Sequence, residues 1–317
     1  MRIAVLRGGP SSEHHISLQT GANVINALKR RGISVIDIII NRRGDWLIDG
    51  FHKKPAEALV AVDVAFIALH GKYGEDGQVQ RILENCGVRY TGSRPYQSAT
   101  AMNKILTKEI LRDHNVKMPA HLRVNKAGVN IRRMAQTIES LFGHSYIVKP
   151  VNGGSSIDTY QVNGIHELVY ALNEAFKNND ELLVEEYITG REATVGVVEN
   201  FRGIDLYCLP EVEIKPPPTH SFFSYDVKYN GETSEVCPGR FSSEEKANLS
   251  RLAILTHNVL GLSHYSRSDF IVNNNGIYFL EVNTLPGLTK ESLIPKSLSA
   301  VGHDYDDFIW HLVLLAK

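Results

Sequence analysis

Residues 265–289 have the sequence YSRSDFIVNNNGIYFLEVNTLPGLT. Two apolar segments flank an asparagine-rich turn that ends in glycine, so the stretch predicts a β-hairpin. Glu281 and Asn283 are two residues apart and therefore point to the same face of their strand. Asp269 begins the partner strand roughly opposite Glu281, where facing Cβ atoms lie about 5 Å apart. The hairpin thus predicts three oxygen-bearing side chains on one face.

This group of side chains favours a metal site. Two carboxylates and an amide on an apolar hairpin repel each other and are poorly solvated unless a cation joins them. Oxygen ligands favour magnesium, which usually brings phosphates with it. Arg267, two residues before Asp269, adds positive charge of the kind that stabilises a transferring phosphoryl group. The alternative is a solvated face with scattered charges, and the Arg-x-Asp and Glu-x-Asn pairs together favour magnesium.

Length and composition indicate a soluble globular protein. The chain has 317 residues, of which 43% are hydrophobic and 22% charged, so we expect two or three domains. The net charge of −1 argues against bulk binding to nucleic acid or membranes. The cysteines, Cys86, Cys208 and Cys237, are odd in number and lack metal-ligand spacing, which predicts reduced thiols in a cytoplasm. We expect no signal peptide, and no apolar run approaches the roughly 20 residues of a membrane helix.

The first hundred residues alternate between strand and helix patterns. We expect strands at 3–6, 34–40 and 64–69 and helices at 17–30 and 77–86. This order predicts a doubly wound parallel sheet that binds ligands at the carboxyl ends of its strands. Glu13, after a glycine loop that lacks the dinucleotide spacing, could face a substrate ammonium, but helix N-terminal charge complementarity is the better interpretation of it alone. His70, taken alone, is more often structural.

The middle segment, after a predicted boundary near residue 95, contains a second candidate phosphate site. We expect one helix from 98 to 114, with solvated Lys104 and Lys108, and strands at 145–149, 159–162, 182–188 and 193–198. The sequence after Lys149, PVNGGSS, could fold over phosphates as a flap or form a flexible hairpin tip, and neither alternative is favoured. Glu185 and Glu186, at the end of their strand, are by themselves best interpreted as solvated acids.

The last third of the chain contains a long loop. A strand at 209–214 leads into residues 216–238, a length typical of an active-site lid. This loop contains the sequence YDVKY at 225–229, a lysine between aromatic residues. Helices are expected at 242–260 and 305–315, on either side of the hairpin.

Six motifs, in this order along the chain, resemble the D-alanine–D-alanine ligase family of ATP-grasp enzymes. They are Gly8-Gly9-x-Ser11-x-Glu13-His14-x-Ile16-Ser17-Leu18, His70-Gly71-x-x-Gly74-Glu75-Asp76-Gly77, Lys149-Pro150 with Gly154-Ser155-Ser156, Tyr225-x-x-Lys228-Tyr229, Arg267-x-Asp269, and Glu281-x-Asn283-Thr284-x-Pro286-Gly287. The resemblance covers essentially the whole chain.

The resemblance implies an α/β ATP-grasp fold with an N-terminal Rossmann-like domain at 1–95, a central lobe at 96–182 and a C-terminal lobe at 183–317. It also implies ATP-dependent ligation of two D-alanine molecules through a D-alanyl phosphate, for peptidoglycan precursor synthesis and cell shape. The implied cofactors are ATP and two Mg²⁺ (or Mn²⁺), and the implied assembly is a cytoplasmic homodimer. The alternatives are a D-Ala–D-Lac or D-Ala–D-Ser ligase or another carboxylate–amine ligase, and, less favoured, a nucleotide-binding module without catalysis.

The resemblance assigns residues to the nucleotide and the metals. The phosphates are implied to bind Lys104, Lys149, Gly154, Ser155 and Ser156, with Lys228 reaching the γ-phosphate. Adenine is implied to bind Glu185, Glu186 and Ile188, and the ribose Glu192. The metal ligands are implied to be Asp269, Glu281 and Asn283.

The resemblance also assigns residues to the substrates. The implied substrate-binding residues are Glu13, His70, Lys228, Ser292 and Leu293. A hydrogen-bonded triad of Glu13, Ser155 and Tyr229 is implied to hold the long loop closed, and Arg267 and the Gly287 N–H are implied to stabilise the oxyanion.

Two positions, Gly153 and Asp158, depart from the family's usual pattern, and a third, Tyr229, distinguishes subgroups of the family by their second substrate. The family commonly has an acidic residue where Gly153 stands and often glycine where Asp158 stands, and we expect Asp158 to be mildly repulsive beside a phosphate flap. Tyr229 favours the dipeptide product, because ligases that make D-alanyl-D-lactate usually lack this tyrosine.

Overall fold

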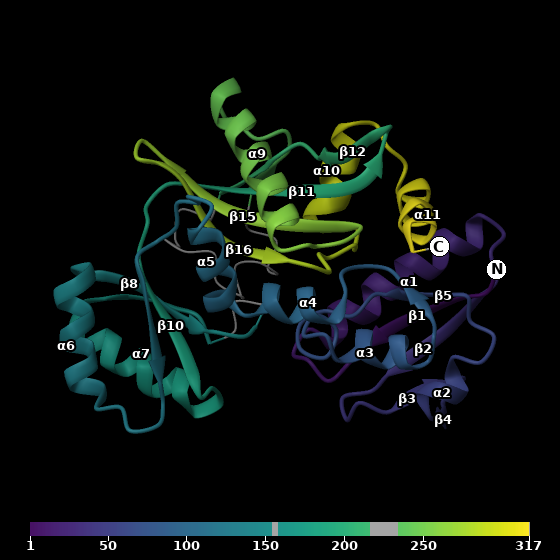
Figure 1. Cartoon of the computed structure of the whole chain (residues 1–317), viewed down its shortest axis with the longest axis horizontal. Coiled ribbons are helices and arrows are strands. Elements are labelled where there is room, and N and C mark those ends of the chain that lie inside the picture. The colour runs from purple at the N-terminus through teal and green to yellow at the C-terminus, as the bar shows by residue number, and fades with distance from the viewer. Residues whose placement is uncertain (154–157, 216–233, 317) are drawn as a thin grey trace.

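The computed structural model describes residues 1–153, 158–215 and 234–316, which form three β-sheets in succession. Figure 1 shows the N-terminal sheet at the right, the middle sheet at the left and the C-terminal sheet across the upper middle. Among these residues, no helix has the length and apolar composition needed to cross a bilayer. The three cysteines are free thiols. The fold is of the expected α/β class.

The N-terminal sheet has the strand order β4-β3-β2-β1-β5-β6. Its strands are β1 (Ile3–Gly8), β2 (Val35–Ile40), β3 (Trp46–Ile48), β4 (Phe51–Lys53), β5 (Val64–Ile67) and β6 (Arg89–Tyr90), and its helices are α1 (His14–Arg30), α2 (Pro55–Ala58) and α3 (Gln78–Asn85). β1, β2 and β5 pair in parallel, as predicted. β6 pairs in parallel with β5 and was not predicted. β3 and β4 add an antiparallel edge that the sequence did not predict.

The middle sheet has the order β7-β10-β8-β9 and is antiparallel. Its strands are β7 (His121–Asn125), β8 (Ser145–Pro150), β9 (Tyr160–Asn163) and β10 (Glu181–Glu186), and its helices are α6 (Ile131–Phe142) and α7 (Gly164–Asn178). The apolar faces of the helices and the sheet form a separate hydrophobic core, which includes Tyr146 and Leu172. The predicted boundary between residues 182 and 183 falls inside β10. The division of the chain into three domains remains a prediction.

The C-terminal sheet has the order β14-β13-β11-β15-β16, with β12 paired to β11. Its strands are β11 (Arg191–Phe201), β12 (Ile204–Cys208), β13 (Val212–Lys215), β14 (Ser234–Val236), β15 (Tyr265–Asn273) and β16 (Gly276–Asn283). The predicted hairpin is β15–β16, and Asp269 pairs with Glu281, as predicted. Of the predicted long loop, residues 216–233 lie outside the described residues.

Three helices accompany this sheet. They are α9 (Ser243–Val259), α10 (Leu293–Ala300) and α11 (Tyr305–Leu315). α9 begins with a capping box in which Ser242 and Glu245 exchange side-chain and backbone hydrogen bonds. α11 packs against α1, where Arg30 and Asp306 form an ion pair of 2.6 Å. The last helix therefore joins the C-terminal sheet to the N-terminal one.

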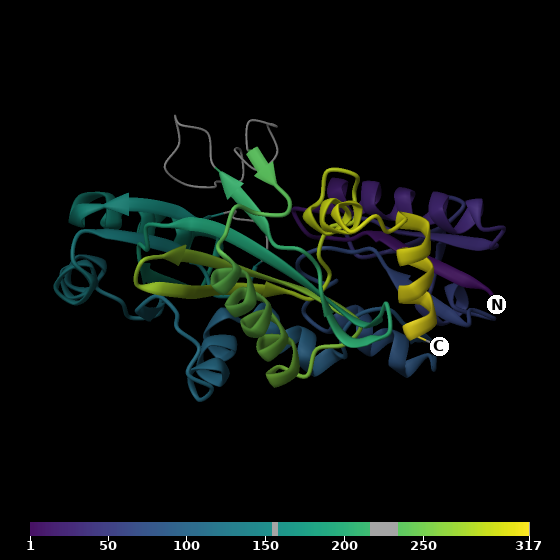
Figure 2. The same cartoon turned by 90° about the horizontal axis from the view of Figure 1, so that it is seen from above.

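The single helix predicted at 98–114 is wrong, because the structure has two helices there. They are α4 (Pro95–Met102) and α5 (Lys104–Arg112). Asn103 between them has an extended backbone, with ψ of 101°, and its side chain accepts hydrogen bonds from the N–H groups of Ile105 and Leu106, both at 3.1 Å. Asn103 is thus the N-cap of α5, and it also forms a β-bridge with Asn152. Figures 1 and 2 show α5 beside α9, with which it makes contact.

Replacing Asn103 by alanine is expected to lower the free energy of unfolding by about 1 kcal/mol, because two N–H groups of α5 lose their acceptor. Asn103→Asp keeps an acceptor oxygen and is expected to stay close to the parent. Urea denaturation followed by circular dichroism measures both variants. Equal losses for the two substitutions would contradict a capping role.

Candidate active site

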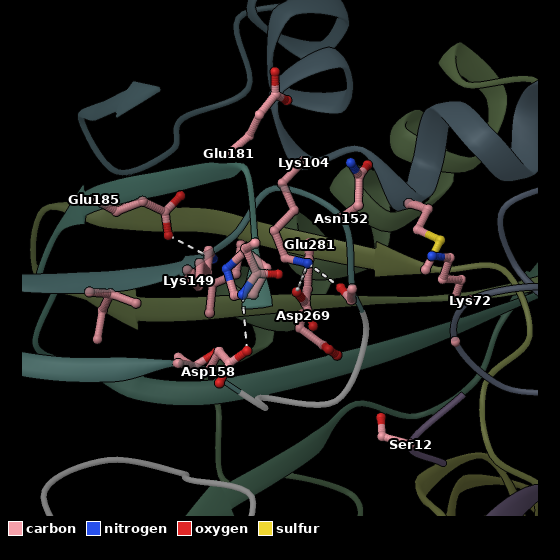
Figure 3. Close-up of a pocket in the computed structure, with 18 of the residues that line it drawn as sticks. Ser12, Lys72, Lys104, Lys149, Asn152, Asp158, Glu181, Glu185, Asp269 and Glu281 are labelled. Carbon is pink, nitrogen blue, oxygen red and sulfur yellow. Dashed lines mark hydrogen bonds and ion pairs between the residues drawn. The ribbon is translucent and has the colours of Figure 1, made fainter. Parts of the chain in front are cut away.

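A cavity of about 1270 Å³ lies where the three sheets meet, and it collects side chains from all of them. Figure 3 shows it from Glu185 at one side to Lys72 and Ser12 at the other. The sequence-predicted site residues that line it are Glu13, Lys104, Lys149, Glu185, Glu186, Ile188, Glu192, Arg267, Asp269, Glu281 and Leu293. The structure thus brings most of the described candidates to one place.

Other candidates lie elsewhere. Asn283 lines a small adjoining cavity together with Glu281. Among the described residues, His70, Gly287 and Ser292 are not in the lining of either cavity. Gly154, Ser155, Ser156, Lys228 and Tyr229 lie outside the described residues.

The hairpin carboxylates lie against positive charges of the chain. Both oxygens of Asp269 accept hydrogen bonds from the Arg267 guanidinium, at 2.9 and 2.8 Å. Thr194, on β11, donates a further hydrogen bond to Asp269, and the Asn283 amide lies 3.3 Å from it. Glu281 forms an ion pair of 3.3 Å with Lys104, which also donates to the carbonyl of Gly153. Each carboxylate is therefore compensated from within the chain.

The donor set of the hairpin fits magnesium. The described residues contain no group of three His, Cys, Asp or Glu side chains placed to hold a metal ion. One or two carboxylates are nevertheless the usual protein contribution to a magnesium site, in which phosphates and water supply most other ligands. The hairpin offers two carboxylates and an amide oxygen. Arg267 and Lys104 neutralise the same oxygens that a divalent cation would use, so the carboxylates are already arranged for positive charge.

A second group of buried charges lies at the other side of the cavity. The two carboxylate oxygens of Glu185 pair with Lys108 and Lys149, each at 2.7 Å, and all three side chains are buried. Burial opposes the charge of Glu185, but the two ammonium groups outweigh it and lower the pKa of Glu185 to about 2. For Lys149, the attraction of Glu185 and Glu281 likewise outweighs burial and raises the pKa. Lys104 is buried as well, so the interpretation of Lys104, Lys108 and Glu185 as solvated side chains is wrong.

At the N-terminal side, Glu13 is buried and precedes α1. Its backbone N–H donates to Ser11 Oγ at 3.2 Å, and the same hydroxyl donates to the His70 carbonyl at 2.6 Å. The His70 ring bonds to the carbonyl of Leu285 at 2.9 Å and to the hydroxyl of Thr20 at 2.8 Å. His70 thus bridges the N-terminal sheet and the segment after the hairpin, which supports the structural interpretation of this histidine.

Glu75 is a buried carboxyl that sequence reasoning did not assign to the site. Its oxygens accept hydrogen bonds from the N–H of Gly71 at 2.8 Å and of Leu285 at 3.4 Å. Burial and the nearby charge of Glu13 raise the pKa of Glu75 to about 7. Two signals in the sequence pointed to it, namely its place in a glycine-rich loop at the end of a strand and its place in the second of the six family motifs.

Asp158, one of the departures from the family pattern, also lines the cavity. It has a left-handed backbone, with φ of 55°, which explains why glycine suits this position. Its carboxylate accepts hydrogen bonds from the amides of Asn179, at 2.9 Å, and Asn178, at 3.3 Å. These two asparagines line the cavity as well, and no sequence pattern indicated them.

An N-terminal α/β sheet followed by two sheets that enclose a charged cavity defines an ATP-grasp fold, and comparisons with known proteins agree. The family model described as "D-ala D-ala ligase C-terminus" matches residues 110–314, and the one described as "D-ala D-ala ligase N-terminus" matches residues 2–58 and 49–93. The chain belongs to the D-alanine–D-alanine ligase family.

Individual proteins resemble this chain over its whole length. A D-alanine–D-alanine ligase from Geobacter sulfurreducens is 36% identical, with 100% of this chain and 94% of that protein covered. The crystal structure of a D-alanine–D-alanine ligase from Bacillus anthracis complexed with ATP has a TM-score of 0.80 at 29% identity, covering 100% of this chain and 96% of that one. The crystal structure of VanG D-Ala:D-Ser ligase from Enterococcus faecalis has a TM-score of 0.83 at 27% identity, covering 100% of this chain and 99% of that one.

The raised pKa of Glu75 predicts that stability depends on pH. The carboxyl has a pKa near 4.5 when unfolded and about 7 when folded, so the folded chain holds the proton longer. The stabilisation is complete below pH 4.5 and is lost between pH 4.5 and 7, with a total change of about 3 kcal/mol at most. Glu75→Gln, which cannot ionise, is expected to flatten this dependence in urea denaturation at a series of pH values. A parent and variant with parallel profiles would contradict the assignment.

Proposed function

We propose that the chain ligates two D-alanine molecules to D-alanyl-D-alanine with ATP, through a D-alanyl phosphate, for peptidoglycan precursor synthesis. The observation that carries the proposal is the hairpin group of Asp269, Glu281 and Arg267, which faces a cavity that also contains Glu13. Family membership and the relatives named as D-alanine–D-alanine ligases favour this reaction over other carboxylate–amine ligations. A homodimer in the cytoplasm, as the resemblance implies, belongs to the same proposal.

In this proposal ATP lies along the cavity between the two charge clusters. Adenine contacts Glu185 and the backbone up to Ile188, and Glu192 binds the ribose. Lys104 and Lys149 take the phosphates, together with the Gly154–Ser156 flap and Lys228. Support comes from the described members of this set, all of which line one cavity, and from the ATP complex of a structural neighbour.

Asp269, Glu281 and Asn283 would hold two Mg²⁺ (or Mn²⁺). When bound, the metal would neutralise charge on the β- and γ-phosphates during the transfer. Thr194 fixes one oxygen of Asp269 through its hydroxyl, so that the carboxylate keeps its orientation.

The chemistry proceeds in two steps. The carboxylate of the first D-alanine, its ammonium near Glu13, attacks the γ-phosphorus and releases ADP. The amine of the second D-alanine then attacks the acyl carbon and the C–N bond forms. The bond from the acyl carbon to the phosphate oxygen breaks, and inorganic phosphate leaves with the proton that the amine loses. Arg267 and the Gly287 N–H stabilise the oxyanion of the tetrahedral intermediate, which forms when the amine attacks and collapses when phosphate leaves.

The second substrate and the closed state complete the proposal. Ser292 and Leu293 hold the carboxylate of the second D-alanine. A Cβ at Gly287 would lie 2.7 Å from Ser292 Oγ, so a side chain at this position would force that hydroxyl to move. The Glu13–Ser155–Tyr229 triad closes the long loop and excludes water, which would otherwise hydrolyse the acyl phosphate.

A D-Ala–D-Ser ligase is the second candidate, because VanG D-Ala:D-Ser ligase shares the fold over the whole chain. Tyr229 favours an amine as second substrate and therefore does not separate D-serine from D-alanine. The identity of the product with equimolar D-alanine and D-serine decides between these candidates.

With D-alanine as sole amino acid, phosphate release is expected to require ATP, magnesium and D-alanine together. The product, identified by mass, is expected to be D-alanyl-D-alanine with one phosphate released for each dipeptide. ATP turnover that is indifferent to D-alanine would overturn the proposal. Replacement of D-alanine by L-alanine serves as the control.

Glu281→Gln is expected to lower kcat/KM by about 100-fold or more, because a metal ligand loses its charge and several kcal/mol of transition-state stabilisation depend on the metal. Mn²⁺ binding in the presence of ADP, followed by electron paramagnetic resonance, is expected to weaken in parallel. Glu291→Gln is the matched control, because Glu291 is exposed and pairs only loosely with Lys296, at 3.7 Å. Unchanged Mn²⁺ affinity in the Glu281 variant would remove this residue from the metal site.

A further inference from the structure

Lys108 is a buried charged group that the proposed function does not use. Its side chain is fully buried on α5 and ranks among the largest fully buried side chains of the described residues. Burying an ammonium group costs several kcal/mol unless it is paired, so such a residue needs a specific partner. Its partner is Glu185, at 2.7 Å.

Lys104 and Lys108 are one helical turn apart and serve the two charge clusters separately. Lys104 lines the cavity and pairs with Glu281 of the hairpin. Lys108 pairs with Glu185 of β10 and is absent from the cavity lining among the described residues. Since residues four apart lie on the same face of a helix, α5 supplies a cation to each cluster.

The two lysines that share Glu185 are not equivalent. Lys149 and Glu185 both line the cavity, so a bound polyanion can attract Lys149 away from the carboxylate. Lys108 is enclosed and cannot reach a ligand. Once Lys149 turns to a phosphate, Lys108 is the cation that remains on Glu185. Without it, the buried carboxylate would be left uncompensated at the moment when it faces the ligand.

We propose that Lys108 is a positioning residue that fixes the carboxylate of Glu185 while Lys149 binds phosphate, and that it thereby sets the preference for a 6-aminopurine nucleotide. The inference rests on the proposed function, in which Glu185 receives the adenine amino group. A fixed carboxylate can only accept hydrogen bonds. Each of its oxygens can accept one from a lysine and still has a lone pair free for a hydrogen bond from the base. It therefore accepts from a 6-amino group and repels a 6-oxo group.

The surroundings of Glu185 support this division of roles. The charged and titratable groups around it are Lys108 from α5, Lys149 from β8 and His121, its neighbour on β7. Burial and the attraction of Glu185 act in opposite directions on Lys108, and burial prevails, which lowers its pKa. His121 bonds to the carbonyl of Pro119 at 2.9 Å, and burial lowers its pKa, so it does not replace a lysine as the partner of Glu185.

The test compares the affinities of ATP and inosine triphosphate, whose base carries a 6-oxo group, by calorimetry with magnesium and without D-alanine. The parent is expected to bind ATP more tightly by about 100-fold. Lys108→Met is expected to weaken ATP binding by about 10- to 100-fold and to bring the two affinities within about threefold, because Glu185 is no longer fixed. Lys246→Met is the matched control, because Lys246 pairs with the buried Glu211, at 2.7 Å, and is absent from the cavity lining. Lys246→Met is expected to keep the parent's ratio of ATP affinity to inosine triphosphate affinity.

A double-mutant comparison separates positioning from a general structural effect. If Lys108 acts through Glu185, adding Lys108→Met to Glu185→Gln is expected to leave the affinities for both nucleotides unchanged. This comparison decides even if Lys108→Met alone does not fold, because Glu185→Gln still offers Lys108 an acceptor oxygen and the double variant contains neither charge of the pair. The inference would be overturned if the double variant bound the nucleotides more weakly than Glu185→Gln. It would also be overturned if Lys108→Met kept the parent's ratio of ATP affinity to inosine triphosphate affinity.

The parent protein distinguishes failure of the inference from failure of the proposed function. A parent that forms the dipeptide but does not distinguish ATP from inosine triphosphate contradicts only the role of Lys108. A parent that binds neither nucleotide contradicts both.

Discussion

The arrangement of the cavity depends on how the charges of the β15–β16 hairpin are compensated. Asp269 and Glu281 face each other in the ladder, and like charges at this spacing destabilise a strand pair. Arg267 compensates Asp269 from the same strand, but the cation that compensates Glu281 comes from α5, more than 170 residues earlier in the chain. The ion pair with α5 therefore helps to stabilise the hairpin, and both of its members, Lys104 and Glu281, line the cavity.

The helix break at Asn103 makes this contact possible. A continuous helix through residues 98–114 would have one axis, whereas the extended residue between α4 and α5 starts the second helix beside the loop that contains Asn152 and Gly153. From there Lys104 reaches Glu281 and Lys108 reaches Glu185. One short helix thus connects the buried Glu185 with the half-buried Glu281, and both acids line the same cavity.

The sequence predicted the features that depend on local periodicity. The register that places Asp269 opposite Glu281 follows from a two-residue strand period and a short turn, and α11 begins and ends where the apolar pattern does. The burial of Lys108 and Glu185 could not be predicted in this way, because a lysine on an isolated helix and an acid at a strand end are both normally solvated. Only the packing of α5 against the middle and C-terminal sheets removes the water. The β3–β4 edge was missed for a similar reason, since its three-residue strands are too short to show a period.

The N-terminal sheet shares one apolar core with the C-terminal part of the chain, in which Leu28 and Phe308 are both buried, and backbone groups near the cavity add polar contacts to it. The carbonyl of Leu285, just after the hairpin, forms a hydrogen bond with the His70 ring, and its N–H donates one to the Glu75 carboxyl. Both partners come from one loop at the carboxyl end of β5, the end at which doubly wound sheets bind their ligands. Because Glu75 also lies near Glu13, the loop that fixes the hairpin is electrostatically coupled to the carboxylate that faces the cavity. In the proposed reaction, a substrate ammonium near Glu13 would relieve the repulsion between these two acids and would thereby favour the docking of the N-terminal sheet on the segment after the hairpin.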